Sequence, residues 1–182
     1  FIWAGAFGKL PSKQDLKNIQ NATASEVYAA DGVLLGKYFK ENRVNVGLDE
    51  ISDHFKNALV ATEDARFFEH GGIDVRAWGR VLYKTILMQD QSGGGGSTIS
   101  QQLGKNLFKR KHYRFLEIPI VKIREMMIAR RLEDVYSKDE LLALYLNTVP
   151  FSRNIYGVQV ASKQFFNNTP TNIKVEQAAT LI

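Results

Sequence analysis

From residue 52 onward, apolar side chains recur at intervals of three and four residues, and this spacing restricts that part of the chain mainly to α-helices. Ser52 is a suitable N-cap for the first helix, which we expect to end at Gly71 and Gly72. Ser137 and Glu140 form a capping-box pattern that opens a later helix. The other helical patterns cover residues 74–88, 98–108, 118–134, 156–166 and 173–182. We therefore predict an all-α fold after residue 50.

The first 49 residues differ from the rest because they contain a β-hairpin pattern. Apolar residues between positions 26 and 39 flank Asp31-Gly32, a dipeptide typical of tight turns. Residues 1–7 are apolar and suit either the end of a truncated membrane span or a short packing segment. The last helical pattern breaks off at Ile182, so we expect both ends to be cuts in a longer protein. No apolar run approaches the roughly 20 residues that a membrane-spanning helix needs.

The length of 182 residues favours one domain, and the absence of cysteine excludes disulfides and thiolate metal sites. The net charge of +5 is concentrated in residues 105–131, which carry +7. Such a segment favours an anionic partner: nucleic acid, anionic lipid or a phosphorylated substrate. Within it, residues 108–116 interleave basic and aromatic side chains, as interfacial membrane contacts do. A solvated helix face would also explain the charge, and no nucleic-acid fold signature is present.

Two adjacent acids, Glu63 and Asp64, stand at the end of an apolar helical pattern, before Phe67, His70 and a pair of glycines. A carboxylate held against aromatic side chains is poorly solvated, and this environment suits a general base. An exposed pair of acids at the end of a helix is the alternative interpretation.

A glycine-rich stretch, residues 89–96, leads into the hydroxyl-bearing segment 97–102. Glycines followed by hydroxyls at a helix start present backbone N–H groups and hydroxyl donors that bind phosphate or pyrophosphate. Lys105 and Asn106 follow within two turns and are placed to reach the same anion. An ordinary Ser/Thr N-cap would give the same pattern, and the GK[ST] ending of a nucleotide P-loop is missing. We predict that residues 89–96 form a mobile lid over the substrate, with an idle surface loop as the alternative.

Lys122 and Glu125 form a third candidate site, because their i, i+3 spacing places both side chains on one helix face. The lysine is suited to hold a pyrophosphate. The glutamate is suited to orient that lysine or to bind a divalent cation. A surface ion pair would have the same spacing.

Together and in this order, these segments resemble the peptidoglycan glycosyltransferases (glycosyltransferase family 51). These form the polymerising domain of class A penicillin-binding proteins and the monofunctional transglycosylases. The resemblance spans residues 50–182, and the combination of motifs is very specific. Residues 8–12 and the hairpin resemble the membrane-proximal lead-in of the bifunctional members. The matching segments are EDARFFEHGG at 63–72, GSTISQQLGKN at 96–106, KIRE at 122–125, YSKDELLALYLN at 136–147, YGV at 156–158, FF at 165–166 and EQAA at 176–179.

The resemblance implies a lysozyme-like fold of two helical lobes, with residues 1–49 as a membrane-proximal lead-in and residues 50–182 as the glycosyltransferase domain. It implies polymerisation of lipid II by inverting transfer, with release of undecaprenyl pyrophosphate. Glu63 is then the catalytic base, and Glu125 is a second catalytic residue that organises the pyrophosphate contacts. The implied substrate-binding residues are Asp64, Arg66, Phe67, His70, Ser97, Thr98, Gln101, Gln102, Lys105, Asn106, Lys122, Arg124, Tyr145 and Asn147.

The same resemblance implies partners and a location. The partners are lipid II, the lipid-linked glycan chain, the membrane surface and, in the full-length protein, a C-terminal transpeptidase domain, with no nucleic acid. The location is the bacterial inner (cytoplasmic) membrane, with the catalytic domain outside the cytoplasm. The sequence requires no cofactor, but it leaves open a divalent cation, Mg²⁺ or Mn²⁺, with Glu125 as the candidate ligand.

Two positions depart from the family pattern. Val121 replaces the arginine that usually precedes Lys122, and Arg124 is the candidate to supply that charge. Asn154 stands in a loop where the family usually has glycine, and asparagine tolerates the left-handed backbone conformation. Two rival functions remain. Hydrolysis of peptidoglycan needs a protonated acid at the leaving oxygen and gives the phosphate-binding segment no purpose. A non-catalytic lipid-binding module does not explain the presence of both glutamates.

Overall fold

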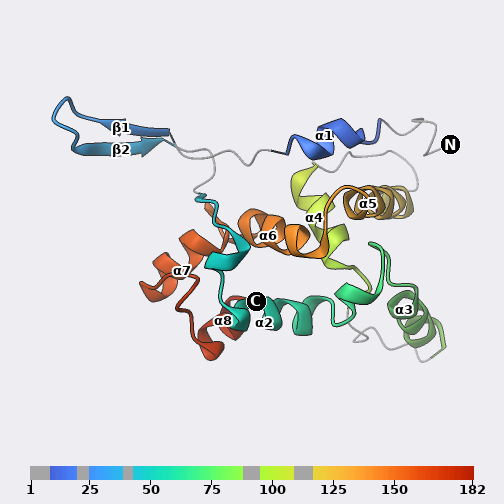
Figure 1. Cartoon of the computed structure of the whole chain (residues 1–182). Coiled ribbons are helices and arrows are strands. Elements are labelled where there is room, and N and C mark those ends of the chain that lie inside the picture. Colours follow the sequence, from blue (N-terminus) through green and yellow to red (C-terminus); the bar gives the residue numbers. More distant parts are fainter. Residues whose placement is uncertain (1–8, 20–24, 39–42, 88–94, 109–116) are drawn as a thin grey trace. The chain divides into compact units, whose positions relative to one another are not determined.

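The structure is a computed structural model that describes residues 9–19, 25–38, 43–87, 95–108 and 117–182. Helices dominate these residues (Figure 1), which confirms the predicted all-α class with a small N-terminal hairpin and agrees with a lysozyme-like fold. Two short 3₁₀ helices lie at Leu48–Glu50 and Phe67–Glu69. The helices are α1 (Lys13–Lys17), α2 (Asp53–Glu63), α3 (Val75–Leu87), α4 (Ile99–Leu107), α5 (Glu117–Glu133), α6 (Lys138–Thr148), α7 (Val158–Phe166) and α8 (Val175–Leu181), and the strands are β1 (Ser25–Tyr28), β2 (Leu34–Tyr38), β3 (Pro150–Ser152) and β4 (Ile155–Tyr156).

The chain divides into two compact units, each built from two separate stretches of sequence. The first unit combines residues 1–18 with 59–141, and the second combines residues 19–58 with 142–182. The segments 63–72, 96–106 and 122–125 therefore all belong to the first unit. The predicted boundary between residues 49 and 50 separates a membrane-proximal lead-in from a glycosyltransferase domain by their roles, not by their packing. That boundary stays a prediction.

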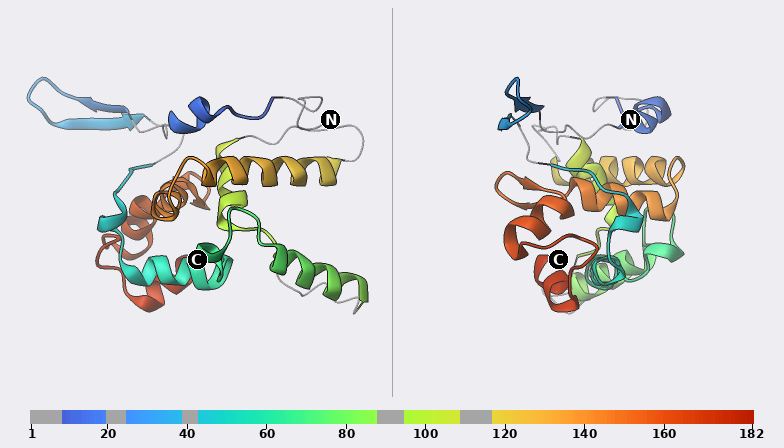
Figure 2. Two further views of the ribbon diagram at one scale, coloured as in Figure 1. Left: turned by 45° about the vertical axis from the view of Figure 1, so that its right-hand side comes forward. Right: turned by 60° about the vertical axis from the view of Figure 1, so that its left-hand side comes forward.

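The first unit is organised around α4, which packs against α5 (Figure 2). The two helices approach closely at Gly104, where an added Cβ would lie 3.0 Å from Cγ2 of Ile128. Full burial of one large apolar side chain stabilises a fold by about 1.5–3 kcal/mol, so a shared core fixes α4 and α5 strongly. The buried apolar side chains of this unit include Leu59, Phe67, Ile99, Leu103, Ile128 and Leu132.

Predicted helix caps fix where the helices begin. The backbone N–H of Phe55 donates to Oγ of Ser52 over 3.3 Å, which confirms Ser52 as the start of α2. Ser137 and Glu140 exchange hydrogen bonds at the start of α6: the Ser137 N–H donates to the Glu140 carboxylate over 2.7 Å, and the Glu140 N–H donates to Oγ of Ser137 over 3.3 Å. These bonds satisfy backbone donors that would otherwise lack a partner in the first turn.

The second unit contains both β-hairpins. Strands β1 and β2 pair antiparallel, and Gly32 in their turn has a φ of +83°, as the Asp31-Gly32 pattern predicts. Strands β3 and β4 form a second short hairpin around Asn154, whose φ of 65° confirms the expected left-handed conformation. The Asn147 side chain exchanges two hydrogen bonds of 2.9 and 2.8 Å with the backbone of Val46, so it ties α6 to the chain before α2.

Two predictions about the elements were wrong. The helix that begins after Ser52 ends at Glu63, not at Gly71 and Gly72, because buried Asp64 and Phe67 are held by tertiary contacts that a continued helix would break. The chain after residue 50 is also not entirely helical, since β3 and β4 pair there. Among the helices in the described part of the chain, none has both the length and the apolar character to cross a membrane.

Candidate active site

The first unit contains a polar cavity of about 380 Å³. Acidic, amide, hydroxyl and basic side chains all face it, which is a typical composition for a site that handles charged polar substrates. A second, smaller cavity of about 190 Å³ shares four lining residues with it: Thr62, Glu63, Gly95 and Ser97. The residues lining the larger cavity are Thr62, Glu63, Gly95, Ser97, Gln101, Gln102, Lys105, Lys122 and Glu125.

Glu63 is the last residue of α2, and its side chain is half-buried. Its Oε2 accepts a hydrogen bond of 2.5 Å from Nε2 of Gln102 on α4. This bond leaves Oε1 of Glu63 outside the contact and fixes the direction of the carboxylate in the cavity. The end of α2 and Gln102 of α4 together therefore hold the Glu63 carboxylate in a defined orientation, which a general base requires.

The basic part of the cavity comes from α5 and from the segment before α4. Nζ of Lys122 donates to Oγ of Ser97 over 2.7 Å and to Oε2 of Glu125 over 3.3 Å. Glu125 is buried, with 5% of its surface exposed, whereas Lys105 on α4 is exposed at the cavity. The sequence spacing correctly places Lys122 and Glu125 on one face of α5. Lys122 also binds a half-buried hydroxyl, and both residues line a cavity, so the pair differs from a plain surface ion pair.

The predicted phosphate-binding segment begins α4 with Thr98 as its N-cap. Oγ1 of Thr98 donates to the carbonyl of Gly72 over 2.8 Å and accepts from the N–H of Gln101 over 3.2 Å. The Thr98 hydroxyl is thus engaged within the protein, as the N-cap interpretation predicts, while Ser97 lines both cavities. Gln101 is 1% exposed, and its buried Oε1 has no hydrogen-bond partner among the residues that the structure describes.

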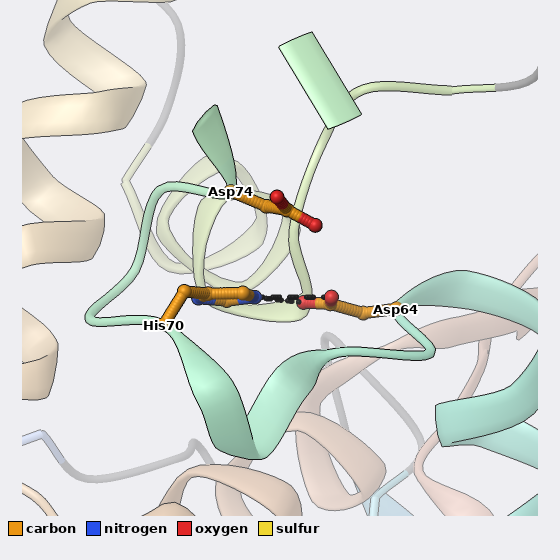
Figure 3. Close-up of side chains that lie close together, drawn as sticks. All are labelled: Asp64, His70 and Asp74. Carbon is orange, nitrogen blue, oxygen red and sulfur yellow. Dashed lines mark hydrogen bonds and ion pairs between the residues drawn. The ribbon is translucent and has the colours of Figure 1, made fainter. Parts of the chain in front are cut away.

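Behind Glu63, a network of polar side chains joins α2 to α4. Figure 3 shows His70 and Asp64 facing each other, with Asp74 alongside. Nδ1 of His70 accepts the N–H of Gly72 over 3.2 Å, so Nε2 carries the hydrogen and donates to Asp64 over 3.0 Å. Oδ2 of Asp64 also accepts the N–H of Ile99, the first residue of α4, over 3.1 Å. The carboxylate beside Glu63 therefore holds the start of α4 in place.

Asp74 completes this network. Nε and Nη2 of Arg66 donate to its Oδ2 over 3.0 and 2.6 Å, and the N–H of Ala77 donates to Oδ1 over 2.9 Å. Burial, the largest single influence, raises the pKa of Asp74, but the bonds from Ala77 and Arg66 together outweigh it and hold the pKa below the ordinary value of 3.8. Asp74 is therefore a buried, charged anchor for Arg66.

Asp64, His70 and Asp74 offer three ligand atoms that lie within 4.8 Å of one another. Each of these groups already has partners: Ile99 for Asp64, Gly72 for His70, and a guanidinium for Asp74. Because a metal would have to displace the cationic Arg66 side chain, the donor set is built as a hydrogen-bond network. We propose no metal in this cluster.

The structure brings together seven of the predicted site residues in the larger cavity: Glu63, Ser97, Gln101, Gln102, Lys105, Lys122 and Glu125. Three more, Asp64, Arg66 and Thr98, line the smaller cavity, and six line neither of the two: Phe67, His70, Asn106, Arg124, Tyr145 and Asn147. Asn106 is exposed, Nη2 of Arg124 donates to the carbonyl of Lys9, and Tyr145 and Asn147 are buried in the second unit. Sequence reasoning missed Thr62 and Gly95 as lining residues, and it missed Asp74, whose only signal was a carboxylate before a helical pattern.

Two predicted features fall on residues outside the described part of the chain. The glycine-rich lid covers residues 89–96, of which the structure describes 95 and 96. The interfacial segment covers residues 108–116, of which it describes Phe108 alone. Both therefore stay predictions.

Comparison with known proteins places the chain in a family. Residues 31–182 match the family described as Transglycosylase. The chain belongs to this family. Penicillin-binding protein 1F of Bacillus subtilis (strain 168) is 39% identical over 170 residues, which make up 92% of this chain and 23% of that protein. Penicillin-binding protein 1A of Escherichia coli (strain K12) is 34% identical over 173 residues, 95% of this chain and 20% of that protein.

A third relative, penicillin-binding protein 1A/1B of Bacillus subtilis (strain 168), is 41% identical over 169 residues, 92% of this chain and 18% of that protein. The chain thus spans about a fifth of the length of the curated relatives it matches. The family match confirms the resemblance derived from the sequence motifs and includes all the segments that line the larger cavity.

Proposed function

We propose that this chain is a peptidoglycan glycosyltransferase domain that polymerises lipid II into glycan strands. The observation that carries the proposal is a single cavity lined by the oriented Glu63 carboxylate and by Lys122 with Ser97. A base and a cationic hydroxyl-bearing site in one cavity suit transfer of a sugar from a pyrophosphate carrier. Membership of the transglycosylase family supports the same reaction class.

In the proposed reaction, Glu63 accepts the proton of the 4-hydroxyl of the acceptor sugar, a lipid II unit. The electron pair left on that oxygen forms a bond to the anomeric carbon of the terminal sugar of the growing chain. The bond from that carbon to the pyrophosphate oxygen breaks, and its electron pair leaves with undecaprenyl pyrophosphate. Attack opposite to the leaving group inverts the configuration from α to β. Gln102 keeps Glu63 directed at the acceptor by donating to Oε2.

The leaving group needs stabilisation of negative charge rather than a proton. Lys122, Ser97 and Lys105 provide this, because they line the cavity with an ammonium, a hydroxyl and a second ammonium. Glu125 keeps Lys122 in position through the 3.3 Å ion pair. A divalent cation such as Mg²⁺ or Mn²⁺, held by the Glu125 carboxylate, would add further charge neutralisation.

Hydrolysis of finished peptidoglycan is less well supported. It needs a carboxylic acid that protonates the leaving oxygen. It also needs a second carboxylate that activates water or attacks the sugar as a nucleophile. The second carboxylate of this cavity, Glu125, is buried and paired with Lys122, so it is already engaged within the protein. A phosphate-binding role for Lys122 gives that pairing a purpose in transfer.

The proposed substrates place the domain at the outer face of the bacterial inner (cytoplasmic) membrane, where the lipid-linked chain and lipid II both reside. Because the chain covers about a fifth of the named penicillin-binding proteins, a longer protein with a transpeptidase domain is the proposed setting.

The test is polymerisation by the purified chain. Incubation with lipid-linked disaccharide-pentapeptide in detergent or vesicles should give a ladder of glycan strands on a gel. In parallel, incubation with finished peptidoglycan should release no soluble fragments. Fragments without strands would replace the proposal by hydrolysis. Lipid binding without either product, unchanged in Glu63→Gln, would replace it by a non-catalytic lipid-binding module.

A further inference from the structure

An ion pair between Lys138 and Glu133 contacts two other parts of the first unit, α4 and residues 67–70. Nζ of Lys138, the first residue of α6, donates over 2.8 Å to Glu133, the last residue of α5. The carboxylate of Glu133 also accepts a 2.5 Å hydrogen bond from Oγ of Ser100 on α4. The Glu133 side chain is 8% exposed and the Lys138 side chain 23%, so the pair is largely shielded from water. Neither residue lines either of the two cavities.

Lys138 also reaches the segment that follows Glu63. The same Nζ donates to the carbonyl oxygen of His70 over 2.6 Å and lies 4.2 Å from the centre of the buried Phe67 ring. A partly desolvated cation attracts both a carbonyl dipole and the face of an aromatic ring. Lys138 therefore holds residues 67–70 by two independent contacts.

These contacts form a closed ring of hydrogen bonds between residues 64–70, α4, α5 and α6. His70 donates to Asp64, and Asp64 accepts the N–H of Ile99 at the start of α4. The next residue, Ser100, donates to Glu133, which in turn binds Lys138. Lys138 then returns to the carbonyl of His70. Each member is fixed by two neighbours, so removal of one link frees the segments on both sides of it.

Glu63, the proposed base, and its hydrogen-bond partner Gln102 both lie next to residues of this ring of contacts. Glu63 precedes Asp64 in the chain, and Gln102 lies on α4 two residues after Ser100. The 2.5 Å hydrogen bond between Glu63 and Gln102 joins α2 to α4. It requires that residues 64–70 keep their position against α4. A displacement of about 1 Å at a reacting group can lower the rate by about a hundredfold.

We propose that Lys138 is a positioning residue: with Glu133, it holds the 64–70 segment against α4 so that Glu63 keeps its orientation toward the acceptor. This rests on the proposed glycosyltransferase function. The pair acts through His70 and Asp64 and touches no substrate, so its loss lowers turnover while substrate binding at Lys122 and Ser97 persists.

A double variant in which both members of the ion pair are uncharged separates an effect on positioning from an effect on stability. Lys138→Met leaves the shielded Glu133 charge without its partner and lowers the melting temperature. The double variant Lys138→Met/Glu133→Gln removes that unpaired charge and keeps an acceptor for Ser100, so the melting temperature recovers. The donor to His70 is still missing. Turnover of lipid II should therefore stay about ten- to a hundredfold low in the double variant, with KM changed less than about threefold.

A matched control removes a lysine of similar exposure, 24%, from another ion pair. Lys56 pairs with Asp53 over 2.6 Å on α2, and the Asp53 side chain is 84% exposed. Lys56→Met should leave turnover and KM unchanged. If the double variant regains turnover together with its melting temperature, the Lys138–Glu133 pair has a stabilising role alone, and the proposal is overturned.

Hydrogen exchange provides an arm that does not depend on activity. Amides of residues 64–72 and 98–102 should exchange about tenfold faster in the double variant than in the parent, because their local opening no longer breaks the Lys138 contacts. Unchanged exchange would overturn the positioning role even if turnover fell. If the parent chain forms no glycan strands, the proposed function fails by itself, and exchange still decides whether Lys138 holds the segment.

Discussion

Gly72 is the position where a single methyl group should disturb the site most. Its φ is +87°, in the left-handed region, and an added Cβ would lie 2.9 Å from both the carbonyl carbon and the oxygen of Ala129 on α5. The atoms in the way belong to backbone, which cannot rotate aside. The carbonyl of Gly72 also accepts the Thr98 hydroxyl that caps α4. Gly72→Ala therefore strains the contact between the Glu63 segment, α4 and α5.

The expected cost has two parts. An alanine in the left-handed conformation costs about 1–2 kcal/mol. Overpacking against rigid atoms adds about 1–3 kcal/mol. We therefore expect Gly72→Ala to lower the free energy of unfolding by about 2–5 kcal/mol, a large part of the roughly 5–15 kcal/mol that stabilises a typical protein.

Gly79 provides a control of opposite sign. It lies within α3, where an added Cβ would meet no atom of the described residues within 4 Å. Alanine at an open helical position is about 1 kcal/mol more favourable than glycine, so Gly79→Ala should stabilise the chain. Urea denaturation followed by circular dichroism measures both variants, with equal slopes expected. If Gly72→Ala is as stable as the parent, the close approach of Gly72 to α5 is incorrect.

Two further substitutions test the electrostatics of the site. Lys122→Ala should lower turnover by about ten- to a hundredfold, since it removes charged hydrogen bonds of about 1.5–3 kcal/mol from the leaving group. Binding to liposomes in the same buffer should be unchanged, and an equal loss of both would move Lys122 to the membrane surface. Asp74→Asn should lower the free energy of unfolding at neutral pH by about 1–3 kcal/mol. Because the folded pKa of Asp74 is depressed, its stabilisation is present above the ordinary pKa of 3.8 and is lost as pH falls below it. Urea titrations should therefore show the parent and Asp74→Asn converging in acid, and a constant difference down to the lowest pH would contradict the charged anchor.

The helices and their caps were predictable because they depend on local spacing. Ser52 and Ser137 each satisfy backbone donors a few residues away, and the sequence contains both members of each contact. Asn154 was predictable for a similar reason, since its left-handed conformation follows from the short turn that it occupies. Lys122 and Glu125 share a face of α5 because three residues separate them on a helix.

Contacts between distant segments could not be predicted from spacing. Asp64 accepts the N–H of Ile99, 35 positions later in the chain, and this contact helps to end α2 at Glu63 although the apolar pattern continues. Gln102 reaches Glu63 across 39 positions. The partners of Lys138 lie in two other parts of the chain, the end of α5 and residues 67–70, and its sequence signal was only a place inside a capping box. The motifs identified the residues, and the tertiary structure assigns them to the cavity or to its support.

The measurement that tests the central claim most directly is polymerisation by Glu63→Gln beside the parent chain. The substitution keeps the shape of the side chain and removes its ability to accept a proton, so the rate should fall by about 10²–10⁴-fold while the circular dichroism spectrum is unchanged. Glu69→Gln is the matched control, because the Glu69 side chain is 62% exposed and lies in neither cavity. It should polymerise lipid II at the parent rate. A Glu63→Gln variant that retains more than about a tenth of the parent rate would contradict the assignment of Glu63 as the base.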